Sequence, residues 1–137
     1  KIEVLQTKDA GKRLEDMTAE DILVSVHVNL YSDPAGEGLR GFYRSSRKHN
    51  SEKCKALAIT VTKGLRDHID LYYHGVFNEE RNRFPELASV VQARGLGTLV
   101  EVGFRDGYKD KLSNSTLAKN IGDGIGIGII RHLSALH

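Results

Sequence analysis

Two ionisable side chains stand out because each lies inside a short apolar stretch: His27 in residues 22–30 and Glu101 in residues 98–104. Such a group costs free energy among apolar residues unless it is paired, bound to a metal or used in catalysis. A neutral imidazole is a good zinc ligand, and zinc with an open position lowers the pKa of its bound water to about 7. A neighbouring carboxylate can take a proton from that water and return it to a leaving amine. The two residues together suggest metal-assisted hydrolysis of an amide bond.

Each of the two residues also has an ordinary structural explanation. A single histidine on a half-buried strand can be a core residue whose hydrogen bonds are satisfied, and a strand glutamate can be one member of an ion pair. Residue type alone therefore leaves zinc-dependent hydrolysis as one hypothesis beside these two.

Both stretches have the alternation of β-strands. In the first, valines fall on one face, and Ser25, His27 and Asn29 fall on the other. In the second, Glu101 lies on the face opposite its apolar neighbours. A strand this apolar is expected to be buried on both faces, so a polar second face in the first stretch indicates the floor of a site.

Two amphipathic helices are expected to accompany the strands, because apolar residues recur at helical spacing from 51 to about 67 and from about 115 to 133. Strands interleaved with helices predict a single α/β domain over 1–137, with a mixed, largely parallel sheet flanked by helices. Ligands bind such sheets outside the carboxyl ends of the strands. His27, Asn29 and Glu101 are therefore expected to converge on one crevice.

Other segments carry weaker signals. Strands are predicted at 1–6 and 85–91, and mostly irregular structure at 70–83. The last helix contains Gly122, Gly124, Gly126 and Gly128, each of which costs about 1 kcal/mol relative to alanine. Close packing of this helix on the sheet would explain them.

A local run of basic residues follows the predicted strand at 22–30: Arg40, Arg44, Arg47, Lys48 and His49. A solvated face is the first interpretation, and attraction to an acidic polymer is the alternative.

The composition bounds the class of protein. A chain of 137 residues can bury one core, and 39% apolar with 28% charged residues is typical of a soluble globular domain. The net charge of +2 is too small to indicate nucleic-acid binding. No apolar run approaches the roughly 18 residues of a membrane span, so no membrane insertion is expected. The single Cys54 excludes an internal disulfide.

Several motifs resemble those of one enzyme family. Asp21–Asn29 and Gly97–Phe104 are similar to two catalytic strands of the zinc-dependent N-acetylmuramoyl-L-alanine amidases. Gly38–Tyr43 looks like the family's third strand, and Leu117–Ile125 resembles its closing helix. Val4–Asp9 is similar to a further motif upstream, so the resemblance runs along nearly the whole chain in order.

The resemblance implies hydrolysis of the amide between the lactyl group of N-acetylmuramic acid and L-alanine in peptidoglycan, with zinc as cofactor. Glu101 matches the family's catalytic glutamate, and His27 matches its second zinc-ligating histidine. Asn29 would line the substrate side. His74 stands where the family often has an arginine, and is a weaker candidate for substrate binding.

One departure from the family is evident. Its other two zinc ligands are a histidine in a loop after the first strand and a glutamate on the first helix, and nothing before His27 matches them. The chain is therefore expected to be an amidase-like domain that is incomplete at its N-terminus. The rival hypothesis is a non-catalytic peptidoglycan-binding module derived from the amidase fold, and a weaker one is another metallopeptidase that cuts between amino acids.

The biological setting follows from the same resemblance. The expected partner is peptidoglycan or a muropeptide, and the expected place of action is extracytoplasmic, at the cell wall. An autolysin of a bacterium and an endolysin of a phage fit equally well, and the sequence does not determine the oligomeric state.

Overall fold

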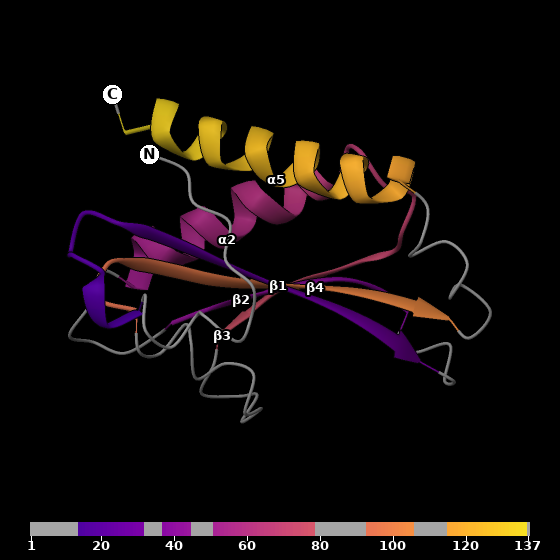
Figure 1. Cartoon of the computed structure of the whole chain (residues 1–137), viewed down its shortest axis with the longest axis horizontal. Coiled ribbons are helices and arrows are strands. Elements are labelled where there is room, and N and C mark those ends of the chain that lie inside the picture. Colours follow the sequence, from indigo (N-terminus) through magenta and orange to yellow (C-terminus); the bar gives the residue numbers. More distant parts are fainter. Residues whose placement is uncertain (1–13, 32–36, 45–50, 79–92, 106–114, 137) are drawn as a thin grey trace.

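The structure, a computed structural model, describes residues 14–31, 37–44, 51–78, 93–105 and 115–136. In chain order its main elements are β1 (Ile22–Tyr31), β2 (Gly38–Tyr43), α2 (Ser51–Arg66), β3 (Tyr73–Asn78), β4 (Leu96–Arg105) and α5 (Ser115–Ser134) (Figure 1). A short helical segment at 14–16 precedes β1. The strands predicted at 1–6 and 85–91 lie outside the described residues.

The strands form one mixed sheet in the order β1-β4-β2-β3. β1 is parallel to β4, and β2 is parallel to β3, while β2 and β4 are antiparallel. The predicted fold class, a mixed and largely parallel sheet flanked by helices, is confirmed. β4 lies between β1 and β2, and its residues 98–103 have register partners on both sides.

α2 lies against one face of the sheet, and α5 lies on the outer side of α2 (Figure 1). The helical stripe predicted for α2 is confirmed, because all its members are buried: Cys54, Leu57, Ala58, Val61 and Leu65. Under the helix, Leu39 of β2 and Val100, Val102 and Phe104 of β4 complete the core. Alternation therefore directs Arg40 and Glu101, the neighbours of these core residues, to the opposite face.

The glycines of α5 serve the contact between the two helices. A Cβ on Gly124 would lie 2.8 Å from Cα of Leu65, and one on Gly128 would lie 2.5 Å from Cα of Val61. The prediction that these glycines pack on the sheet is wrong, because their partner is α2. For Gly122 and Gly126, a Cβ would meet no heavy atom of the described residues within 4 Å.

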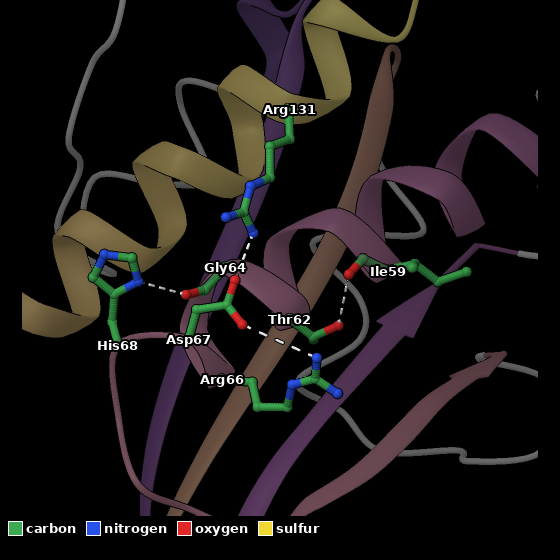
Figure 2. A network of polar contacts seen from close by, with 7 residues as sticks. All are labelled: Ile59, Thr62, Gly64, Arg66, Asp67, His68 and Arg131. Atoms are coloured by element: carbon green, nitrogen blue, oxygen red, sulfur yellow. Dashed lines mark hydrogen bonds and ion pairs between the residues drawn. The ribbon is translucent and has the colours of Figure 1, made fainter.

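Polar contacts hold the C-terminal end of α2 against α5. Figure 2 shows Nη1 of Arg131 donating to Oδ2 of Asp67 at 2.7 Å. Nδ1 of His68 donates to the carbonyl oxygen of Gly64 at 2.8 Å, which satisfies a carbonyl of the last turn. The Arg131 guanidinium lowers the pKa of Asp67 below its ordinary value. The ion pair thus joins the two helices near their ends.

Two expectations about strands are corrected. Residues 73–78, predicted as irregular, form the edge strand β3. Val26 and Val28 are each 41% exposed, so β1 is not buried on both faces. The reason is that β1 lies at the other edge of the four described strands, and α2 lies over β2 and β4.

Among the helices that the structure describes, none is long and apolar enough to cross a lipid bilayer.

Candidate active site

Register brings together three polar residues of three strands. His27 of β1 pairs with Glu101 of β4, and Glu101 pairs with Arg40 of β2 on its other side. Neighbouring strands are about 4.8 Å apart, so the three side chains are immediate neighbours on the sheet. All three leave the face opposite α2, since the residues beside Arg40 and Glu101 belong to the core under that helix. The row forms a polar strip on the face of the sheet opposite α2.

Glu101 and Arg40 form an ion pair within this strip. Nη1 of Arg40 donates to Oε2 of Glu101 at 3.4 Å. The side chains are 18% and 20% exposed, so the pair is largely removed from solvent but still reachable from it. The charge of Glu101 is therefore compensated within the sheet, as a carboxylate on an interior strand requires.

His74 extends the strip beyond Arg40. Its Nε2 lies 2.6 Å from the carbonyl oxygen of Glu37 and 3.4 Å from Nη2 of Arg40. A carbonyl only accepts, so the shorter contact makes Nε2 the protonated nitrogen. Nε2 then has no lone pair for the guanidinium, and the Arg40 contact is one of packing. The imidazole lies at the far side of the guanidinium from Glu101.

Irregular backbone places His74 at this position. The β2–β3 register shifts between Leu39 and Arg40, and Gly75 has φ +117°, a region that side chains rarely adopt. Gly38 makes room for the ring, because a Cβ there would lie 2.6 Å from the imidazole of His74. Two glycines thus permit the bulge that turns the histidine toward Arg40.

An apolar layer adjoins the polar strip on the same face. Leu99 of β4 and Phe42 of β2 are buried together, and the ring of Phe77 lies 6.0 Å from that of Phe42. Leu99 and Phe42 stand two residues from Glu101 and Arg40 along their strands, and Phe77 is the register partner of Phe42, so the three share the face of Glu101 and Arg40. The strip therefore borders a packed, rigid floor.

The sequence-predicted site residues are placed as follows. His27 and Glu101 were expected to converge, and the register sets them directly opposite each other. Asn29 is in β1 and pairs with Gly103, two positions further along the strands; its side chain lies outside the described part. His74, predicted from the resemblance alone, lies at the other end of the strip, beside Arg40.

Arg40 is a partner of Glu101 that sequence reasoning missed. It was grouped with a basic run that was interpreted as a solvated face, and this interpretation is wrong for both described arginines. Arg40 pairs with Glu101, and Arg44 is 4% exposed, with Nη1 donating to the carbonyl oxygen of Ala93 at 2.6 Å. The signal was present in period-two alternation, which puts Arg40 and Phe42 on the face opposite Leu39.

Metal-binding capacity in the described residues is small. No group of at least three histidine, cysteine, aspartate or glutamate side chains in the described part of the chain could hold a metal ion. Catalytic zinc sites use three protein ligands. His27 and its neighbour Glu101 therefore do not make a zinc site by themselves.

The sequence profile of the N-acetylmuramoyl-L-alanine amidase family matches residues 6–131. No curated protein sequence matches the chain.

The fold is similar to solved amidases. An N-acetylmuramoyl-L-alanine amidase from Clostridium difficile 630 has a TM-score of 0.70 at 21% identity, over 95% of this chain and 66% of that one. The CwlD amidase from Clostridioides difficile, solved in complex with the GerS lipoprotein, has a TM-score of 0.72 at 20% identity, and the match covers 93% of this chain and 63% of that one. The catalytic domain of the amidase CwlV from Bacillus (Paenibacillus) polymyxa var. colistinus has a TM-score of 0.70 at 21% identity, and the match covers 96% of this chain and 68% of that one.

The chain spans less than two thirds of the length of the first two of these structures. At this level of identity the structures establish the fold, and the family match over 6–131 covers more than half of the sequence. This chain belongs to the N-acetylmuramoyl-L-alanine amidase family.

Proposed function

We propose that the protein to which this chain belongs hydrolyses the amide bond between the lactyl group of N-acetylmuramic acid and L-alanine in peptidoglycan, with Glu101 as general base. One observation carries the proposal: Glu101 and His27 are register partners on the face of the sheet opposite α2, in a chain of the amidase family. Residues 1–137 are proposed to form one amidase-like catalytic domain.

Glu101 is suited to proton transfer. It is 20% exposed, so water and a substrate amide can reach it, and its strand fixes its backbone between β1 and β2. A carboxylate oxygen would accept a proton from the attacking water and then deliver it to the leaving amine of L-alanine. The amide C–N bond breaks, and the new C–O bond leaves a lactyl carboxylate. The proton taken from water ends on the amine of L-alanine.

His27 is proposed as a zinc ligand, in keeping with the family resemblance. Bound zinc would polarise the scissile carbonyl and lower the pKa of a water molecule. The described residues do not provide the three ligands that such a site needs, so no step is assigned to the metal. The chemistry assigned to this chain is the proton transfer by Glu101.

Asn29 and His74 are proposed to line the substrate side. They lie at opposite ends of the polar strip of His27, Glu101 and Arg40. Asn29 is on β1 beyond His27, and His74 is on β3 beyond Arg40. A muropeptide bound along the polar strip would pass both. The cell wall is outside the cytoplasm, so the proposed place of action is extracytoplasmic.

Mass analysis of digested peptidoglycan tests this function. Purified wall material is incubated with the protein, and soluble products are identified. Stem peptides with a free L-alanine amine, together with glycan strands that keep an intact lactyl group, are the expected products. Products cleaved between amino acids would instead indicate a metallopeptidase.

A non-catalytic peptidoglycan-binding module is the second candidate, and one observation favours it: the described residues lack a three-ligand metal group. This candidate predicts that the protein sediments with wall material and releases no product, with or without added zinc. Product release would exclude it.

A further inference from the structure

We propose that Arg40 is a positioning residue that orients the carboxylate of Glu101. The inference rests on the proposed function of Glu101 and adds to it a residue that the family resemblance did not indicate. Arg40 would act on catalysis through Glu101, and would not itself touch the reacting atoms.

The first argument is the geometry of the pair. Arg40 and Glu101 are register partners on antiparallel strands, so their side chains leave the sheet side by side. Nη1 of Arg40 binds Oε2 of Glu101 at 3.4 Å. A contact to one particular oxygen restricts rotation of the carboxylate, whose terminal torsion is otherwise broad. His27 lies on the other side of Glu101, so the carboxylate that Arg40 restrains lies between the guanidinium and His27.

The second argument is the support behind the guanidinium. Nη2 of Arg40 lies 3.4 Å from Nε2 of His74, and that ring is held by a 2.6 Å hydrogen bond to the carbonyl oxygen of Glu37. Tyr72 also packs on the imidazole in a T-shaped arrangement, with 4.8 Å between the ring centroids. Arg40 is therefore confined between a fixed imidazole and Glu101. A catalytic group held by such a supporting layer keeps its geometry.

The third argument concerns what Arg40 is not placed to do. With its side chain 18% exposed and Nη1 committed to Glu101, its charge is already compensated within the protein. A substrate carboxylate would have to compete with Glu101 for this guanidinium. The arrangement therefore favours orientation of Glu101 over substrate binding.

Steady-state kinetics on a soluble muropeptide test the inference. In Arg40→Met, kcat is expected to fall about 10- to 100-fold, since displacement of a reacting group by about 1 Å can cost 100-fold, while KM stays within about twofold. Arg40→Lys keeps the charge and is expected to recover part of kcat. Arg66→Met is the matched control, because Arg66 is an exposed arginine of α2, and parental kinetics are expected. A changed KM with unchanged kcat would overturn the inference in favour of substrate binding.

A second measurement does not depend on turnover. The melting temperatures of Arg40→Met, Glu101→Gln and the double variant form a cycle that isolates the coupling of the two side chains. The melting temperature of the double variant is expected to fall by clearly less than the sum of the falls in the two single variants. Additive losses would mean that Arg40 does not hold Glu101, and would overturn the inference.

The two measurements separate this inference from the proposed function. If Glu101→Gln abolishes turnover and Arg40→Met leaves kcat unchanged, the function stands and the positioning role fails. If the parent protein releases no product, the proposed function fails, and the melting-temperature cycle alone decides whether Arg40 orients Glu101.

Discussion

Glu101 lies between His27 and Arg40 in the register of a single sheet, paired with His27 across parallel strands and with Arg40 across antiparallel ones. The spacing of these three groups is therefore set by backbone hydrogen bonding between strands. Sites built on strands hold their geometry more precisely than sites built on loops. The mixed topology matters here, because it brings a residue of β2 to the same level as residues of β1 and β4.

Replacement of His27 by alanine tests its assignment as a zinc ligand. The variant is expected to retain less zinc after purification without chelators than the parent, because one imidazole ligand is lost. Elemental analysis per mole of protein measures this, and His68→Ala, at the end of α2, is the control histidine. Equal zinc content in His27→Ala and parent, or a parent that retains no zinc, would contradict the assignment.

The glycines of α5 predict opposite effects on stability. Gly128→Ala is expected to destabilise the fold by about 1–3 kcal/mol, because its Cβ would lie 2.5 Å from Cα of Val61 in α2. Gly126→Ala is expected to stabilise it by up to about 1 kcal/mol, since alanine favours the helix and no described atom stands in the way.

Urea unfolding of the two variants measures both effects, with Gly124→Ala and Gly122→Ala as a second pair. Equal changes in the free energy of unfolding for Gly128→Ala and Gly126→Ala would contradict the packing of α5 on α2.

Stability is expected to fall in mild acid because of His132. This residue of α5 is 3% exposed, and within the described part of the chain its Nε2 has no hydrogen-bond partner. Burial lowers its pKa below the ordinary value of 6.5. Below about pH 6.5 the unfolded chain therefore binds a proton at His132 that the folded chain does not. The contribution of His132 to the free energy of unfolding is complete above about pH 6.5 and is lost as the pH falls toward the pKa of the folded state.

Urea unfolding at pH 7.5 and pH 5.5 measures this effect in the parent and in His132→Leu. The parent is expected to lose more stability than the variant between the two pH values. An equal loss in both proteins would show that His132 does not carry the dependence.

Local periodicity explains which elements could be predicted from the sequence. The stripe from Cys54 to Leu65 has helical spacing, and the residues around His27 and Glu101 alternate strictly, so α2, β1 and β4 were predicted close to their observed bounds. β3 was missed because Gly75 and the register shift beside it break the alternation around His74.

Long-range pairing limited the prediction of the site. His27 and Glu101 were predicted as site residues because each is polar within an apolar strand. Arg40 has basic neighbours in sequence, and its partnership with Glu101 depends on antiparallel pairing of β2 with β4, which residue spacing does not encode. In the same way, helical spacing identified α5, but it could not show that Gly124 and Gly128 face α2.

The digestion rate of purified peptidoglycan by Glu101→Gln tests the central claim most directly. Glutamine keeps the size of the side chain but cannot accept the proton, so the rate is expected to fall about 100- to 10,000-fold, the usual contribution of a general base. Glu20→Gln, at an exposed turn, is the matched control and is expected to digest at the parental rate. If Glu101→Gln, folded as judged by circular dichroism, digests as fast as the parent, Glu101 is not the catalytic base.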